Sequence, residues 1–226
     1  MTRSSADTIL SQIDLTGVVP LFTHDNADEM FEIIRSAYDA GIRVFEMTNR
    51  KANSLEVFST LVKRTKELPG MILGIGTVMD PATTQAFIDA GAPFIISPMM
   101  NPEMAAVCSR NRVPWIPGCA TPTEIITAKQ FGAELIKIFP GSVLGPGLVS
   151  SVLPVVPDVN LMITGGVEPT EESLTSWFKA GARCVGMGSH LFPKQLLETK
   201  DWKALASRIA TTVDLVQRVR SQVKKA

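Results

Sequence analysis

Two charged residues lie inside apolar stretches where a parallel strand would bury them. Lys137 stands in the middle of AELIKIFPG (133–141), and Glu46 follows the apolar run of GIRVFEMTNR (41–50). A Lys or Glu is almost never fully buried unless it is paired or used in chemistry. A neutral amine attacks a ketone to form a Schiff base, and a neighbouring carboxyl moves the protons that C–C cleavage requires.

The surroundings of Lys137 favour this chemistry, since apolar neighbours and a nearby cation such as Arg50 both favour the neutral amine. Two structural alternatives exist. The stem of Lys137 could pack while its ammonium reaches water. Glu46 could instead form a structural ion pair with Lys137 or with Arg43.

Other polar residues follow the apolar runs. Thr48 and Arg50 come directly after the run that contains Glu46, and Thr77 follows LGIG. Two glycine-rich turns, MITGGVEP (162–169) and GMGSHLF (186–192), fit an anion site because backbone amides at such turns bind phosphate. The GIGTVM segment lacks the third glycine of a dinucleotide fingerprint, so a nucleotide site is not expected.

The elements that must position these residues recur along the chain. A helical segment, a glycine and a short apolar run appear together four times, at 38–47, 88–97, 129–139 and 178–187. Further strands are predicted at 17–23, 71–76, 114–117 and 161–164. Eight evenly spaced strands favour a (β/α)8 TIM barrel, a single domain over residues 1–226; a doubly wound sheet is the alternative.

The predicted starts of the helices agree with this assignment of alternating strands and helices. Asp80 and Asn101 each precede a proline, and Thr121 opens a capping box that ends at Glu124. We also expect an N-terminal helix, and a long C-terminal helix over 201–224 that packs against the barrel through residues at helical spacing.

Composition limits the remaining possibilities. Of the 226 residues 45% are hydrophobic and 19% charged, and the formal net charge is zero, so neither nucleic acid nor membrane is an expected partner. Three separated cysteines and two histidines form no metal-ligand pattern. Without a signal peptide or apolar span, we expect reduced thiols, no metal and a cytoplasmic location.

Nearly the whole chain, from GVVPLF to GMGSHLF, resembles the class I aldolases that cleave 2-keto-3-deoxy-6-phosphogluconate (KDPG) or 4-hydroxy-2-oxoglutarate (KHG). GIRVFEMTNR is similar to the acid/base segment of that family, and GAELIKIFPG to its Schiff-base segment. The resemblance implies a TIM barrel, a homotrimer and catalysis without a cofactor.

By position, the resemblance makes Lys137 the Schiff-base lysine and Glu46 the general acid/base. It also implies substrate-binding roles: Arg50 and Thr77 for the pyruvate carboxylate, Pro98 and Phe139 as pocket walls, and Gly165, Gly166, Gly188 and Ser189 for the distal phosphate or its replacement.

The chain departs from the family pattern at several positions around the expected pocket, and the aldehyde half of the substrate is where these departures matter. They are Asn49 in place of a bulky apolar residue, Met99 in place of glycine, Thr23 and His24 where many relatives have an arginine, and Gly141 where some have Ser or Ala.

The leading hypothesis is an aldehyde-lyase that cleaves a 2-keto-4-hydroxy acid to pyruvate and an aldehyde, either glyceraldehyde 3-phosphate or glyoxylate. Two alternatives use the same barrel. A sugar-phosphate isomerase or epimerase would employ Lys137 and Glu46 without a covalent intermediate, and a non-catalytic barrel would only bind a phosphorylated metabolite.

Overall fold

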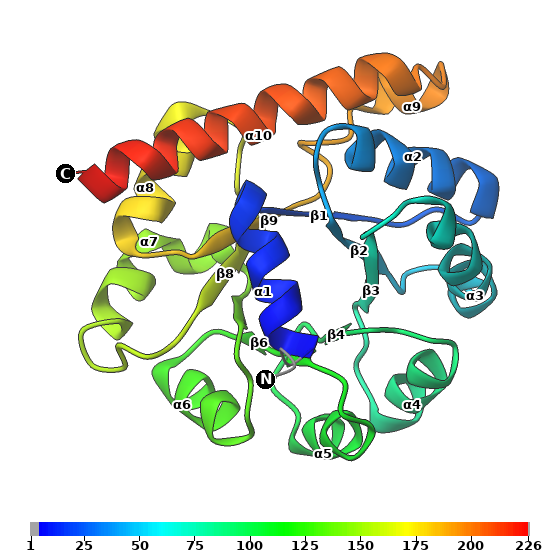
Figure 1. Cartoon of the computed structure of the whole chain (residues 1–226). Helices are drawn as coiled ribbons and strands as arrows, with labels where there is room; N and C mark the ends of the chain where they lie inside the picture. The colour runs from blue at the N-terminus through cyan, green and yellow to red at the C-terminus, as the bar shows by residue number, and fades with distance from the viewer. Residues whose placement is uncertain (1–4, 226) are drawn as a thin grey trace.

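The computed structural model describes residues 5–225, which form one parallel sheet closed into a barrel and surrounded by helices (Figure 1). The strands in this range are β1 (Val18–Phe22), β2 (Val44–Thr48), β3 (Ile72–Gly76), β4 (Ile95–Ile96), β5 (Trp115–Ile116), β6 (Gly118–Cys119), β7 (Ile136–Ile138), β8 (Leu161–Thr164) and β9 (Cys184–Met187). The predicted barrel is therefore confirmed.

One predicted strand differs from expectation, because residues 114–119 form two short segments. β5 pairs only with β4, and β6 pairs only with β7, so the two together close the barrel. Pro117 separates them. It has no N–H to give to a ladder, but its carbonyl accepts a hydrogen bond from Lys137 N at 2.8 Å.

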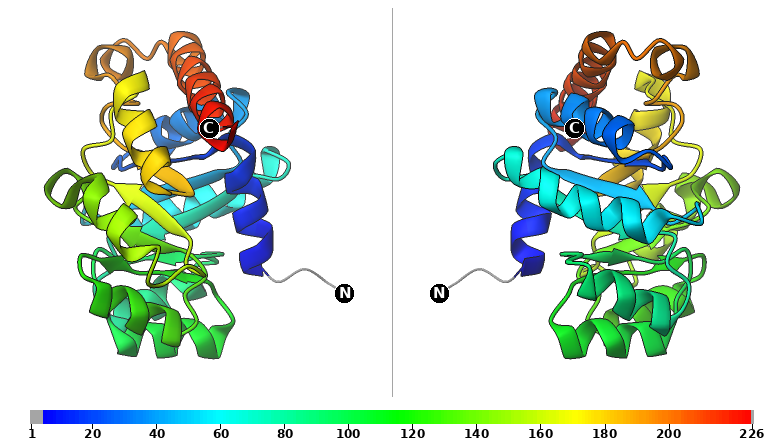
Figure 2. Two further views of the ribbon diagram at one scale, coloured as in Figure 1. Left: turned by 90° about the vertical axis from the view of Figure 1, so that its left-hand side faces the viewer. Right: turned by 90° about the vertical axis from the view of Figure 1, so that its right-hand side faces the viewer.

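Helices surround the barrel, and most of them connect consecutive strands and cover its outside (Figure 2). They are α1 (Ser5–Thr16), α2 (Ala27–Asp39), α3 (Ser54–Arg64), α4 (Pro81–Asp89), α5 (Pro102–Asn111), α6 (Pro122–Gln130), α7 (Gly141–Val152), α8 (Glu171–Ala180), α9 (Lys194–Glu198) and α10 (Trp202–Lys225), with a 3-10 turn η1 (Thr65–Glu67) after α3.

The predicted helix starts are confirmed. The side chain of Asp80 accepts a hydrogen bond from the amide of Thr83, and Asn101 caps α5 in the same way. At α6 both halves of the Thr121–Glu124 capping box are present. These bonds satisfy amides that the first helical turn leaves without partners.

The apolar residues divide between two cores. A large core lies between the strands and the outer helices. A smaller core fills the barrel interior, where Ile9, Leu10 and Ile13 of α1 pack beneath inward-facing residues such as Val19 and Val44. Helix α1 therefore crosses the amino-terminal end of the barrel, as Figure 1 shows. Because the strands are parallel, all their carboxyl ends meet at the opposite, open end.

The long helix α10 packs on α2 and α8 through one apolar face, as its periodicity predicts (Figure 1). Its polar face also reaches α1, since Arg220 Nη1 donates to the carbonyl of Asp14 at 2.8 Å and Gln217 donates to that of Leu15. None of the helices in residues 5–225 is both long enough and apolar enough to cross a membrane.

Candidate active site

Lys137 and Glu46 face each other inside the open end of the barrel. Lys137 is the middle residue of β7 and is 4% exposed, whereas Glu46 of β2 is fully buried. Lys137 Nζ lies 3.7 Å from Glu46 Oε1, an ion pair longer than a hydrogen bond. Arg43, the other candidate partner of Glu46, instead donates to the carbonyls of Tyr38 and Ile42.

A glycine on the neighbouring strand makes room for the Glu46 carboxyl. A Cβ atom at Gly76 would stand 2.7 Å from Glu46 Cγ and nearer still to the carboxyl carbon and Oε1. Gly76 is in register with Thr48, two residues beyond Glu46. The Glu46 side chain therefore leans along β2 toward the open end, over a strand position that carries no side chain.

The electrostatics of this pair suit proton transfer. Burial raises the pKa of Glu46, and the positive charges of Lys137 and Arg50 oppose that rise. Neither carboxyl oxygen has a hydrogen-bond partner among the described residues. A carboxyl with a raised pKa and free lone pairs is a better proton acceptor than an ordinary glutamate, and it can return the proton to a reacting group.

Arg50 and Thr77, which the resemblance assigns to one carboxylate, do come together. Arg50 Nε lies 3.4 Å from Thr77 Oγ1, although one follows β2 and the other follows β3. Thr77 has a φ of 58°, a left-handed conformation that is strained for a β-branched residue. Backbone hydrogen bonds on both sides, from Asn49 N to Gly76 O and from Val78 N to Ile96 O, hold the turn in place.

Pro98 and Phe139 lie beside the lysine. Lys137 Nζ is 5.2 Å from the centre of the Phe139 ring. Pro98 follows β4, and its carbonyl passes so close to Gly118 that a Cβ atom there would overlap it. Gly118 is in register with Lys137. Phe139 is therefore near the amine, and Pro98 lies against the strand position beside Lys137, whereas Met99 is 40% exposed.

The two glycine turns follow neighbouring strands. Gly165 and Gly166 come after β8 with φ angles of 93° and 74°, and Gly188 and Ser189 come after β9. The helix behind the first turn begins only at Glu171, where Thr170 already caps its start. Any anion at this end would thus meet the turn amides rather than the helix terminus.

Part of the polar lining was given no role from the sequence, although Thr23 and Thr48 were noted there. The hydroxyls of Thr23, Thr48 and Thr164 are buried without a hydrogen-bond partner among the described residues. Thr48 and Thr164 end their strands and Thr23 follows β1, each on the inward-facing side. Thr164 Oγ1 would stand 2.5 Å from a Cβ atom at Gly186. The period-2 alternation from Glu46 to Thr48 was the available signal.

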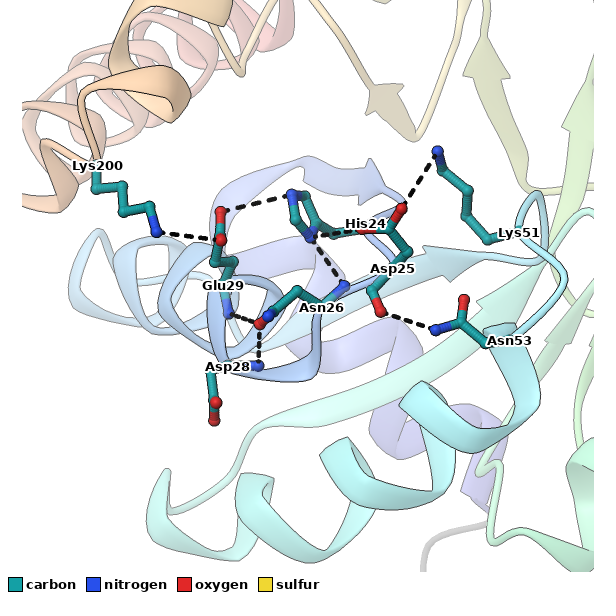
Figure 3. Close-up of polar contacts among 8 residues, drawn as sticks. All are labelled: His24, Asp25, Asn26, Asp28, Glu29, Lys51, Asn53 and Lys200. Carbon is teal, nitrogen blue, oxygen red and sulfur yellow. Dashed lines mark hydrogen bonds and ion pairs between the residues drawn. The ribbon is translucent and has the colours of Figure 1, made fainter.

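A polar network fixes the loops around this mouth (Figure 3). His24 Nδ1 accepts a hydrogen bond from Asn26 N at 3.1 Å, and its Nε2 lies 3.6 Å from Glu29. Lys200, before α10, binds the same glutamate at 3.1 Å. Lys51 and Asn53 contact Asp25 from the loop after β2. The loop after β1 is thereby held to the loop after β2, and the start of α2 to the turn between α9 and α10.

The remaining reactive groups lie elsewhere. Burial raises the pKa of Cys108, Cys119 and Cys184 to about 12 in each case, so these thiols are poor nucleophiles at neutral pH. The part of the chain that the structure describes contains no group of three or more His, Cys, Asp or Glu residues arranged to hold a metal ion.

A parallel barrel with a buried amine facing a buried carboxyl at its open end is suited to an enzyme of the Schiff-base type. Comparison with known proteins agrees. Residues 9–208 match the family model described as KDPG and KHG aldolase. The chain therefore belongs to the KDPG and KHG aldolase family, and it is an aldolase, a carbon–carbon lyase.

Individual relatives extend over nearly the whole chain. It is 29% identical to the 2-dehydro-3-deoxy-phosphogluconate aldolase of Treponema pallidum, over 92% of this chain and 98% of that protein. It is 27% identical to the KHG/KDPG aldolase of Escherichia coli, over 94% and 96%. The fold also matches KDPG aldolase from Legionella pneumophila, solved with pyruvate as a covalent carbinolamine intermediate (TM-score 0.81, 23% identity, 90% and 97% covered).

Proposed function

We propose that this aldolase cleaves 2-keto-4-hydroxy acids, specifically KDPG, KHG or both, through a Schiff base on Lys137. Pyruvate is one product, and glyceraldehyde 3-phosphate or glyoxylate is the other. The observation that carries the proposal is the buried Lys137–Glu46 pair, 3.7 Å apart, with both carboxyl oxygens free of hydrogen bonds from the described residues.

The first half of the reaction forms the covalent intermediate. The neutral amine of Lys137 adds to the C2 carbonyl and gives a carbinolamine, and Glu46 accepts and returns the protons that this step moves. Loss of water then yields a positively charged Schiff base. Arg50 and Thr77 hold the C1 carboxylate, which fixes the keto acid with C2 toward the amine.

The second half breaks the carbon–carbon bond. Glu46, acting through a water molecule, removes the proton from the C4 hydroxyl, and the aldehyde forms as the C3–C4 bond breaks. The bonding electrons move into the Schiff base and produce an enamine. Glu46 then returns a proton to C3, and water hydrolyses the Schiff base to release pyruvate and regenerate Lys137. The iminium is the electron sink, so the scheme uses neither a metal nor an organic cofactor.

The remaining residues complete the proposed pocket. Pro98 and Phe139 form its walls beside the amine. The turns of Gly165, Gly166, Gly188 and Ser189 receive the distal phosphate, or the carboxylate that replaces it, through backbone amides. A homotrimer in the cytoplasm, as the resemblance and composition suggest, is part of the same proposal; sedimentation analysis tests the trimer.

Borohydride reduction in the presence of pyruvate tests the mechanism. We expect irreversible inactivation and a reduced pyruvate adduct on the peptide that contains Lys137, identified by mass spectrometry. Lys203→Ala is a matched control, since this exposed lysine on α10 should not affect the labelling. An isomerase or a binding protein on the same barrel would remain unlabelled and active, and this result would rule the mechanism out.

A further inference from the structure

Thr23 presents a buried hydroxyl that the mechanism above does not use. It is the first residue after β1. Along that strand Val19 faces the barrel interior, while Phe22 turns outward onto the ring of Phe192 at 4.9 Å. The alternation therefore turns Thr23 inward, and its Oγ1 is buried with no hydrogen-bond partner among the described residues.

A buried hydroxyl without a hydrogen-bond partner lowers the stability of the folded protein. Buried polar atoms nearly always have a partner, and an unpartnered one destabilises the fold. Valine has the same shape as threonine and would fill the site without that penalty. The hydroxyl is therefore accounted for best if a molecule that enters the pocket completes its hydrogen bonding.

Strand register gives the height of Thr23 in the pocket. Leu21 pairs with Glu46 and Phe22 with Met47, so Thr23 is next in register with Thr48. Thr23 and Thr48 therefore lie two residues beyond Glu46, which is about 7 Å further along the strand toward the open end of the barrel.

The position of β1 among the strands indicates which part of the substrate lies near Thr23. In the proposed function the pyruvate half lies between Lys137 on β7 and the Arg50–Thr77 pair after β2 and β3. β1 lies on the far side of β2 from β3 and is followed by β9, whose inward positions Gly186 and Gly188 carry no side chain. Thr164 Oγ1 and the Leu21 side chain lie over these two glycines. In the proposed orientation the carbons beyond C4 extend from the pyruvate half toward this β1 side of the mouth.

We propose that Thr23 is a specificity-determining residue, whose hydroxyl forms a hydrogen bond with a substrate hydroxyl beyond C4, on the carbon next to the aldehyde carbon. The inference rests on the proposed function. KDPG has such a hydroxyl at C5, whereas KHG has a carboxylate carbon there. Thr23 thus favours aldehydes with an adjacent hydroxyl over glyoxylate.

The test compares Thr23→Val, which removes the hydroxyl, with Thr23→Ser, which keeps it. Each variant is assayed for addition of pyruvate to glyceraldehyde 3-phosphate and to glyoxylate, and its thermal midpoint is measured. Thr84→Val is the matched control. Thr84 is fully buried whereas Thr23 is half-buried, and the Oγ1 atom of Thr84 donates to the carbonyl of Asp80 at 2.8 Å.

We expect Thr23→Val to lower kcat/KM with glyceraldehyde 3-phosphate by roughly 5- to 150-fold and to change that with glyoxylate by less than about twofold. Thr23→Ser should retain the activity. The thermal midpoint of Thr23→Val should equal or exceed that of the wild type, whereas Thr84→Val should melt earlier and keep its activity toward both aldehydes.

Several results would overturn the inference: equal losses with both aldehydes, no loss with either, Thr23→Ser as impaired as Thr23→Val, or a wild type that accepts glyoxylate alone. If the wild type accepts only glyceraldehyde 3-phosphate, the comparison of the two variants tests the inference: loss of activity in Thr23→Val but not in Thr23→Ser supports it, and equal activity in both contradicts it. Failure of the proposed function is distinct, because the wild type would then show no pyruvate adduct on Lys137.

Discussion

Substituting Gly76 with alanine should disable the enzyme by displacing Glu46. The new Cβ atom would stand 2.7 Å from Glu46 Cγ, against an ordinary contact of at least 3.4 Å. Cγ alone must therefore move by about 0.7 Å, and the carboxyl, which is nearer still, must move further. Glu46 is fully buried, so it has no solvent into which it can turn.

A misplacement of about 1 Å can reduce catalysis about 100-fold, and we expect a loss of kcat of at least that size in Gly76→Ala. Overpacking should also destabilise the fold by roughly 1–3 kcal/mol. Pyruvate release, coupled to its reduction by lactate dehydrogenase, measures kcat, and the thermal midpoint confirms that the variant is folded at the assay temperature.

Two comparisons separate this cause from general damage. Gly147→Ala is the control, since a Cβ atom at Gly147 would meet nothing within 4 Å. In a Glu46→Gln background, Gly76→Ala should reduce kcat little further, because both changes act on one group. A folded Gly76→Ala enzyme that keeps half of the wild-type kcat would refute the reasoning.

Three further predictions concern Glu46 and the scaffold. Glu46→Gln should lower kcat by about 10²- to 10⁴-fold in the coupled assay and slow, without abolishing, the trapping of pyruvate on Lys137; unchanged turnover would contradict its role. Because burial raises the pKa of Glu46 in the folded state, its contribution to stability is present below the unfolded pKa and is lost as pH rises through the folded pKa. Urea midpoints should thus fall with pH more in the wild type than in Glu46→Gln, and parallel curves would exclude this linkage. Thr121→Ala should cost about 1 kcal/mol in urea unfolding with kcat unchanged, and a loss of activity would mean that the capping box does more than start α6.

Local signals predicted the barrel well because each one depends on few neighbours. Glycine after a helical segment and capping residues before proline are set by backbone conformation within one turn. Gly181, for example, ends α8 with a φ of 106°, and Asp80 caps α4. Strand boundaries were less predictable. The division at Pro117 depends on which neighbours β5 and β6 find when the barrel closes.

The residue types of the site were also visible in the sequence, since a charge in an apolar run is costly wherever that run folds. The sequence alone therefore determined the candidates Lys137 and Glu46, the parallel α/β class and the family. It did not determine that these two side chains face each other, because β2 and β7 are far apart in the chain and meet only across the closed barrel.

Only the tertiary structure decided which small and hydroxyl-bearing residues matter. Gly76 is a glycine in a strand with nothing in the sequence to single it out, and Thr23 is visible in the sequence only as a departure from the family pattern. Their importance depends on the tertiary surroundings: Gly76 lies against the Glu46 carboxyl, and the Thr23 hydroxyl is buried without a hydrogen-bond partner among the described residues. Side-chain packing between distant strands, which no local pattern encodes, is the physical reason.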